Sequence, residues 1–205
     1  MEDVISYHGY LPLVKQYLQK LPPDHSPTLL EVGVDRGVSL IPLVAFLART
    51  RKSFTALGID VMVQEQVRIM LMNLDLTQFQ LAHLVEDNSL KTMPKMIDQG
   101  MKFDVLLIDG DHNYYTVAEE LKHLGALTHP HSLVIMDDYD GRWAERDLFY
   151  AERDDYKGNV HATPKVETEK HGVKAAVDEW LAAHSEWKKT QPIHGEPIML
   201  QRQPI

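Results

Sequence analysis

The feature that most constrains the fold is the stretch of residues 103–112, in which an unbroken apolar run ends in two carboxylates and an imidazole. The four residues before Asp109 are apolar, and Asp111 and His112 follow it closely. A short apolar run closed by turn residues is typical of a strand that is buried on both faces of a parallel sheet. Because open parallel sheets bind ligands beyond the carboxyl ends of their strands, we expect these polar side chains to lie at a functional site.

A second stretch, residues 133–140, has the same pattern, since Leu-Val-Ile-Met is followed by Asp137 and Asp138. Two strands that both end in acids predict one shared site. Asp109, Asp137 and Asp138 would repel one another without a cation, and hard divalent ions such as Mg²⁺ prefer oxygen ligands of this kind. We therefore expect a magnesium site. The alternative is that one or two of these acids cap helices or bind a nucleoside by hydrogen bonds.

Apolar strands alternate with amphipathic helices along the chain, which predicts an α/β fold: a doubly wound, mostly parallel sheet of seven strands with helices on both faces. Residues 188–193 and 197–201 flank a turn at 194–196, which predicts a hairpin that adds antiparallel to the sheet and makes the last strand antiparallel. We expect the other strands in the stretch that starts at Thr28 and at 54–60, 79–85, 103–108 and 132–136. We expect helices at residues 10–21, 40–50, 64–72, 90–97, 116–127 and 172–183.

The 205 residues suffice for one full α/β domain, and no linker or internal repeat divides them, so we expect a single domain. Residues 1–27 form an N-terminal helical segment in this interpretation. Residues 140–171 interrupt the alternation with a polar stretch that contains scattered aromatic residues. Because this stretch leaves directly from the second acidic strand end, we expect it to cover the active site; the alternative is a disordered surface insertion.

The composition argues against several classes of function. A net charge of −9 argues against a nucleic-acid partner, since phosphate binding needs a concentrated basic surface. The absence of cysteine rules out disulfides and thiol chemistry. The first residues lack the pattern of a signal peptide, and no apolar run approaches the ~20 residues that span a bilayer, so we expect a cytoplasmic protein without a membrane partner. The composition leaves both a monomer and a homo-oligomer open.

Acidic residues also end or interrupt the first three predicted strands, at Glu31, Asp60 and Asp87. Each could be an ordinary loop acid, but three in succession along one sheet edge fit a single elongated nucleoside ligand better. Asp60, at the end of the second strand, can accept hydrogen bonds from both hydroxyls of a ribose. Ser89, shortly after the third strand, can cap the helix that follows.

The loop after the first strand contains Gly33 and Gly37, and Ser39 can cap the next helix. Glycine allows the backbone to approach a ligand at a helix N-terminus. Asp35 and Val38 occupy positions at which the dinucleotide-binding pattern requires glycine. This mismatch argues against a nicotinamide or flavin enzyme.

Together, these residues resemble the class I S-adenosylmethionine-dependent methyltransferases, which have a Rossmann-like fold. Residues 31–37 look like the first motif of that family, Asp60 matches its ribose-binding acid, and residues 86–89 look like the segment that borders the adenine. The resemblance covers about residues 28–200. It is most specific to a small bacterial branch, related to metal-dependent O-methyltransferases of macrolide and aminocoumarin sugars and more distantly to catechol O-methyltransferase. The segments that resemble this branch are 108–114, 136–139 and 172–180.

The resemblance implies a role for each of these positions. The implied site for S-adenosyl-L-methionine comprises Glu31, Gly33, Gly37, Asp60, Asp87, Asn88, Ser89 and Asp109. Glu31 and the two glycines would hold the methionine half, Asp60 the ribose, and Asp87 the adenine side. The implied Mg²⁺ ligands are Asp109, Asp137 and Asp138. His112 matches the general base of the sugar enzymes, so the resemblance makes His112 and Asp109 the predicted catalytic residues. Asp35 departs from the small residue that is frequent in the first motif, and residues 140–171 have no counterpart.

We therefore expect in-line transfer of the methyl group to an oxygen of a small hydroxylated molecule, such as a sugar or natural product, with Mg²⁺ lowering the pKa of the attacking hydroxyl. His112 would remove the proton, although a packed or solvated histidine is the alternative. Tyr139, Arg142 and Trp143 are candidates for substrate contacts. Two other functions stay open: a metal-independent N- or carboxyl-methyltransferase, and a non-catalytic protein that binds the cofactor.

Overall fold

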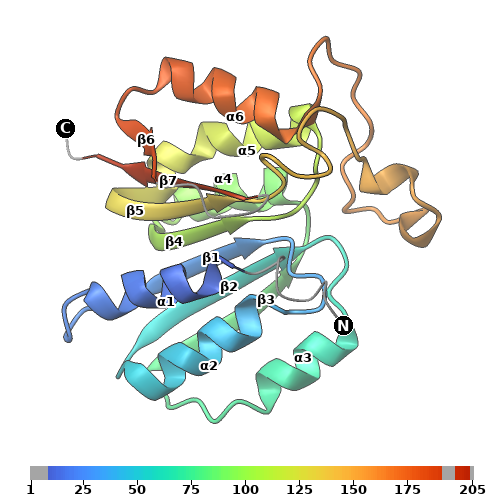
Figure 1. The fold of residues 1–205 in the computed structure, drawn as a ribbon. Coiled ribbons are helices and arrows are strands. Elements are labelled where there is room, and N and C mark those ends of the chain that lie inside the picture. The colour runs from blue at the N-terminus through green and yellow to red at the C-terminus, as the bar shows by residue number, and fades with distance from the viewer. Residues whose placement is uncertain (1–8, 191–196, 204–205) are drawn as a thin grey trace.

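A mixed sheet of seven strands lies at the centre of the computed structural model, which describes residues 9–190 and 197–203 (Figure 1). The strands are β1 (Thr28–Val32), β2 (Phe54–Asp60), β3 (Gln80–Glu86), β4 (Phe103–Ile108), β5 (Thr128–Met136), β6 (Trp187–Lys189) and β7 (Ile198–Arg202). Their order is β3-β2-β1-β4-β5-β7-β6, and β1 to β5 are parallel. Because β7 pairs antiparallel with both β5 and β6, the predicted doubly wound sheet with an antiparallel last strand is confirmed.

Helices cover both faces of the sheet, as the alternating pattern predicted (Figure 1). One face packs against α1 (Leu11–Lys20), α2 (Leu40–Thr50) and α3 (Glu65–Met72). The other face packs against α4 (Ser89–Asp98), α5 (Tyr114–Leu127) and α6 (Gly172–Ala183). Neighbouring residues of one strand point to opposite faces of the sheet. Leu29 belongs to the apolar cluster on the face covered by α1, α2 and α3, whereas Leu30 belongs to the cluster on the face covered by α4, α5 and α6.

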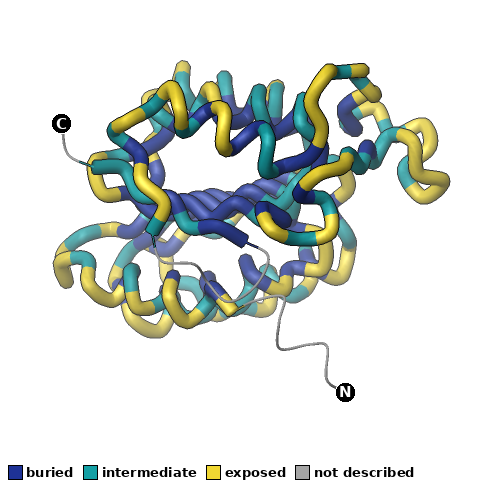
Figure 2. The backbone as a smooth tube through the Cα atoms, turned by 45° about the horizontal axis from the view of Figure 1, so that its top comes forward, coloured by how far each residue is buried: buried dark blue, intermediate teal, exposed yellow. Residues whose placement is uncertain are grey.

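The buried residues concentrate in the sheet between the two helical layers (Figure 2). All six residues of β4 are buried, which accounts for its unbroken apolar run. β1 has β2 on one side and β4 on the other, so the chain reverses its direction of winding between β1 and β4. Such a reversal opens a crevice at the carboxyl ends of the two strands, where ligands bind.

Two helix starts differ from the sequence predictions. Asn88, not Ser89, is the N-cap of α4, and its side-chain oxygen accepts a hydrogen bond from the backbone N–H of Leu90 at 2.9 Å. Ser39 occupies the N-cap position of α2 but makes no capping hydrogen bond with its side chain. Its hydroxyl instead lies 2.7 Å from the hydroxyl of Tyr10, which is buried. Both serine hydroxyls instead make tertiary contacts: that of Ser39 contacts Tyr10, and that of Ser89 donates to Glu120.

Residues 140–171 leave the carboxyl end of β5 and project beyond the sheet edge, in orange in Figure 1. They contain two short 3₁₀ helices, Tyr150–Glu152 and Asp154–Tyr156, joined by loops. The predicted hairpin turn at residues 194–196 and the first eight residues of the N-terminal segment lie outside the described part of the chain. Among the described helices, none has the length and apolarity needed to cross a membrane.

Candidate active site

A cavity of about 640 Å³ opens at the carboxyl ends of β1, β2, β4 and β5. Strand register explains why their acids meet there: Val32 pairs with Ile108, and Ile108 pairs with Met136, so the three strands end level. Just beyond the strand ends, the N–H of Asp109 donates to Val32 at 2.8 Å and the N–H of Asp137 donates to Ile108 at 3.0 Å. The backbone therefore fixes the two acids side by side. Besides the strand ends, the cavity wall includes Trp143, Tyr150, Arg153, Tyr156 and Thr163 from the 140–171 segment.

The loop after β1 passes so close to the loop after β4 that only glycine fits. Gly33 has φ +85°, and a Cβ atom added there would lie 1.8 Å from the carbonyl oxygen of Asp109. Gly37 has φ +72°, and its Cβ would lie 2.9 Å from Ile41. The two glycines of the first motif thus have a steric cause. Gly33 lets the loop lie against the backbone of Asp109 and Gly110, and Gly37 lets it lie against the side chains of Ile41 and Val67.

Asp60 holds this loop in place. Its Oδ2 atom accepts hydrogen bonds from the backbone N–H groups of Val34 and Asp35, both at 2.8 Å, and its Oδ1 atom accepts one from Met62 at 2.9 Å. Burial raises the pKa of Asp60, and the three backbone hydrogen bonds oppose this rise. The side chain also lines the cavity. The predicted ribose-binding acid therefore shapes the loop in addition to facing the ligand space.

Glu31 is buried beside the cavity, with 2% of its surface exposed. Its Oε2 atom has no hydrogen-bond partner among the described residues. Burial raises the pKa of Glu31 well above its usual range, and the nearby Asp60 carboxylate adds to the rise. A buried carboxylate oxygen without a partner is costly, and a cationic group in the cavity would satisfy it.

Of the residues after β3, Asp87 and Ser89 line the cavity, whereas the side chain of Asn88 contacts the 140–171 segment. Asp87 lines the cavity and lies 3.1 Å from both Lys95 Nζ and His161 Nδ1. Burial raises the pKa of Asp87, but hydrogen bonds from the backbone N–H of Asn88 and from the side chains of Lys95 and His161 outweigh this effect. The pKa of Asp87 is therefore lowered to about 2. Asn88, predicted to bind the cofactor, uses its side-chain amide to donate to the His161 carbonyl at 2.6 Å. Ser89 lines the cavity and donates its hydroxyl to Glu120 at 2.6 Å.

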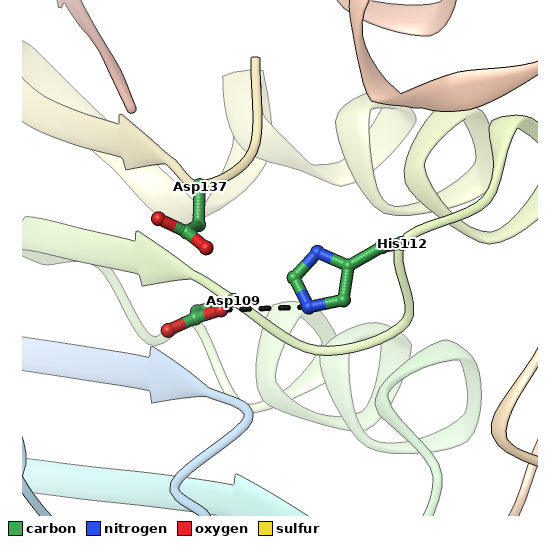
Figure 3. A group of neighbouring side chains, drawn as sticks. All are labelled: Asp109, His112 and Asp137. Carbon is green, nitrogen blue, oxygen red and sulfur yellow. Dashed lines mark ion pairs between the residues drawn. The ribbon is translucent and has the colours of Figure 1, made fainter. Parts of the chain in front are cut away.

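In the same cavity, Asp109, Asp137 and His112 converge (Figure 3). One ligand atom from each lies within 4.8 Å of the other two, which suits a metal ion. Burial, together with the adjacent carboxylate of Asp137, raises the pKa of Asp109 well above its usual range. Burial lowers the pKa of His112 to about 4, so its imidazole is neutral at physiological pH.

Asp138, the third predicted metal ligand, faces the opposite side of the imidazole. Its Oδ2 atom lies 3.2 Å from Nδ1 of His112, whereas Nε2 of His112 lies 3.7 Å from Oδ1 of Asp109. Asp138 has φ +54°, and its carboxylate accepts backbone hydrogen bonds from Arg142 and Trp143. The structure thus brings His112, rather than Asp138, into the group with Asp109 and Asp137.

Of the three candidates for substrate contacts, only Trp143 lines the cavity. Tyr139 does not, because its ring is buried in the apolar core and its hydroxyl donates to Asp178 at 2.6 Å. Arg142 is exposed, and its guanidinium lies 4.9 Å from the centre of the Trp143 ring. Tyr150 and Tyr156 also line the cavity, and the sequence does not mark them as site residues, since an aromatic residue in a polar loop carries no periodic signal.

The chain matches the family described as "Methyltransferase domain" over residues 30–139. Its fold is similar to that of TomG from Streptomyces achromogenes, an O-methyltransferase involved in tomaymycin synthesis, solved with S-adenosylmethionine. The two are 17% identical, the match covers 94% of this chain and 80% of TomG, and the TM-score is 0.57. No curated protein is similar enough in sequence to match this chain.

Two further solved structures share the fold. CalS11, a TDP-rhamnose 3′-O-methyltransferase of calicheamicin biosynthesis, is 14% identical; the match covers 94% of this chain and 77% of CalS11, with a TM-score of 0.59. MycE, a methyltransferase of the mycinamycin pathway solved with Mg and S-adenosylhomocysteine, is 12% identical; the match covers 95% of this chain and 49% of MycE, with a TM-score of 0.56. At these identities the likeness concerns the fold.

Proposed function

This chain belongs to the methyltransferase domain family and is an S-adenosylmethionine-dependent enzyme, and from this premise we propose that it methylates a hydroxyl oxygen of a small molecule with the help of Mg²⁺. The observation that carries the proposal is the convergence of Asp109, Asp137 and His112 in a cavity that is also lined by the glycine loop, Asp60 and Asp87. The first three residues suit a metal and an acceptor, and the others suit a nucleoside.

The residues present fit the cofactor. The loop at Gly33 lines the cavity, and Asp60 and Asp87 line it where ribose and adenine are expected. The buried Oε2 atom of Glu31 lacks a partner among the described residues, and the ammonium group of a methionine moiety would provide one. When bound, S-adenosylmethionine supplies a methyl group on a cationic sulfur.

The residues beside His112 fit a divalent ion. Two adjacent carboxylates, of which Asp109 has a raised pKa because of burial and of the neighbouring Asp137, are the oxygen donors that Mg²⁺ prefers, and the ion would supply a Lewis acid for the acceptor oxygens. Asp109 and Asp137 would hold it. Asp138 stays a predicted third ligand, and it would have to exchange its contact with His112 for the metal.

His112 is the proposed general base. Its Nδ1 atom faces the Asp138 carboxylate, which favours the tautomer with the proton on Nδ1 and leaves the Nε2 lone pair free to accept the hydroxyl proton. With a pKa of about 4, the imidazole is already neutral when it is needed. The rest of the site positions the acceptor oxygen for in-line attack, and orientation of this kind can supply roughly 7–11 kcal/mol.

The acceptor class is proposed from the neighbours. CalS11 acts on TDP-rhamnose, and TomG and MycE belong to the tomaymycin and mycinamycin pathways. We infer a small hydroxylated acceptor for this chain, of the sugar or natural-product type.

The proposal is tested by the transfer of a labelled methyl group from S-adenosylmethionine to a panel of hydroxylated sugars and phenols, with Mg²⁺ and with a chelator. We expect turnover of at least one acceptor that stops with the chelator and returns with excess Mg²⁺. Turnover that survives the chelator would favour a metal-independent methyltransferase, in which Asp109 and Asp137 share a proton instead of an ion. Binding of S-adenosylhomocysteine without any methyl transfer would favour a non-catalytic protein.

A further inference from the structure

A row of aromatic rings runs along one wall of the cavity. The ring of Tyr150 lies 6.3 Å from that of His112, and the ring of Tyr156 lies 4.9 Å from that of Tyr150 (centroid distances). The guanidinium of Arg153 lies 5.5 Å from the Tyr150 ring centre and 6.0 Å from that of Tyr156. These three residues of the 140–171 segment line the cavity, so the row extends from the proposed base into the ligand space.

The far end of this row reaches the predicted ribose site. Burial raises the pKa of Tyr156 to about 12, and the negative charges of Asp60 and Asp35 contribute to the rise. Tyr156 and Asp60 also line the same cavity. The aromatic row therefore extends from His112, the proposed base, into the cavity that Asp60, the predicted ribose-binding residue, also lines.

The segment is attached on the β4 side of the cavity. The N–H of Leu148 donates to the His112 carbonyl at 2.9 Å, in an isolated antiparallel bridge between these two residues. The N–H of Tyr150 donates to Oδ1 of Asp111 at 3.3 Å. The first tyrosine of the row is therefore fixed to the loop that carries the proposed base.

The same segment is attached on the β2 and β3 side. The side-chain amide of Asn159 donates to the Val61 carbonyl at 2.9 Å, and that of Asn88 donates to the His161 carbonyl at 2.6 Å. The His161 ring lies 3.1 Å from Asp87. Residues 148–163 thus cross the cavity between two anchored ends, and any ligand that fills the cavity must lie against them.

We propose that residues 148–163 complete the cofactor site, with Tyr156 as a cofactor-binding residue at the ribose end and Tyr150 as the wall between the cofactor and His112. This inference rests on the proposed function, because it takes S-adenosylmethionine as the ligand. A phenol hydroxyl in the cavity that Asp60 also lines can share hydrogen bonds with a ribose, and tyrosine faces suit both a flat base and a cationic sulfur. The segment is in this reading a part of the binding site and not a surface insertion.

The test is calorimetric binding of S-adenosylhomocysteine to the full chain and to three variants. We expect Tyr156→Ala to weaken binding by about tenfold or more, and Tyr156→Phe by a smaller factor that reports the hydroxyl alone. Val160→Ala is the control, because the Val160 side chain is 79% exposed and is not one of the side chains that line the cavity; the affinity of this variant should equal that of the wild type. A folded Tyr156→Ala protein with wild-type affinity would overturn the inference.

Hydrogen exchange of the wild-type chain gives a second readout that needs no variant. Bound S-adenosylhomocysteine should slow exchange of the backbone amides in residues 148–163 as well as in the loop after β1. Slower exchange in the β1 loop without any effect on residues 148–163 would overturn the inference and leave the proposed function intact. If the wild type binds no S-adenosylhomocysteine at all, both fail together.

Discussion

The Nδ1 atom of His112 lies 3.2 Å from the Oδ2 atom of Asp138, which is itself buried. A carboxylate at this nitrogen fixes the ring orientation and favours the tautomer whose lone pair is on Nε2. The Nε2 atom points toward Asp109 and the cavity, 3.7 Å from the nearest carboxylate oxygen. The pair thus has the geometry of a base with its orienting acid.

Replacement of the base should lower the rate without affecting the cofactor. We expect His112→Gln to reduce kcat by roughly 10²–10⁴-fold, because proton removal by a positioned base typically contributes that much. The affinity for S-adenosylhomocysteine, measured by calorimetry, should stay at the wild-type value. His83→Gln, at an exposed position on β3, is the control and should leave kcat unchanged. Wild-type turnover by the His112 variant would remove this residue from the mechanism.

Loss of one of the proposed metal-binding acids should abolish Mg²⁺ binding and turnover. Asp137→Asn removes one of two adjacent carboxylates, so we expect loss of calorimetric Mg²⁺ binding and of turnover, with cofactor affinity nearly intact. Asp140→Asn is the control, because Asp140 is exposed and pairs with Lys174. Asp138→Asn should lower kcat even at saturating Mg²⁺, since Asp138 faces His112. Unchanged Mg²⁺ affinity in Asp137→Asn would contradict the proposed site.

Neutralisation of Glu31 should raise the folding stability of the ligand-free protein and weaken its binding of the cofactor. The Oε2 atom of this buried carboxylate lacks a partner among the described residues, so Glu31→Gln should stabilise the ligand-free protein at neutral pH. The same change should weaken S-adenosylhomocysteine binding by about tenfold or more, because an ion pair with the ligand ammonium is lost. Thermal melting and calorimetry measure the two effects. An affinity equal to that of the wild type would rule out the proposed ammonium contact.

The steric demand at Gly33 can be measured directly. Gly33→Ala places a Cβ atom 1.8 Å from the Asp109 carbonyl oxygen at φ +85°, so we expect a loss of several kcal/mol of folding stability or a displaced loop that binds no cofactor. Gly125→Ala is the matched control: it lies within α5, no atom is within 4 Å of its Cβ position, and it should raise the melting temperature through about 0.5–1 kcal/mol of helix propensity. Similar melting shifts in the two variants would contradict this reading of the loop.

Glu120 should make the folded state less stable as pH rises. It is 1% exposed, and burial raises its pKa from 4.5 to about 8, so the folded protein keeps a proton that the unfolded chain loses above its ordinary pKa. The contribution of Glu120 to the free energy of unfolding is complete below pH 4.5 and is lost as pH rises toward 8. The loss in the free energy of unfolding is on the order of 4 kcal/mol.

Glu120→Gln removes this proton dependence while keeping an oxygen for the Ser89 hydroxyl. Denaturant unfolding at pH 5 and pH 8 should therefore show that the variant gains stability over the wild type mainly at pH 8. Glu119→Gln, on the outer face of the same helix and paired with Lys122, should show no such difference. Equal gains at both pH values would mean that Glu120 is not protonated in the folded state.

Local sequence patterns were sufficient for the architecture. The apolar run of β4, the glycine spacing after β1 and the helix periodicity each depend on a residue's own immediate surroundings. Parallel strands with level carboxyl ends then bring Asp109 and Asp137 together, so their proximity could be predicted without coordinates. The antiparallel pairing of β6 with β7 was likewise predicted from the local strand and turn pattern.

The direction in which side chains point was decided only by tertiary packing. Asp138 turns to His112 through a left-handed backbone, the side-chain amide of Asn88 donates to the His161 carbonyl, and the Ser89 hydroxyl donates to Glu120. Each of these contacts joins residues from different elements, and a pattern along one chain does not encode them. The same is true of Tyr150 and Tyr156: their place in the cavity wall depends on hydrogen bonds to loops far away in the sequence. Periodicity reports which face of an element is buried, whereas the partner across a cavity depends on how all the elements pack together.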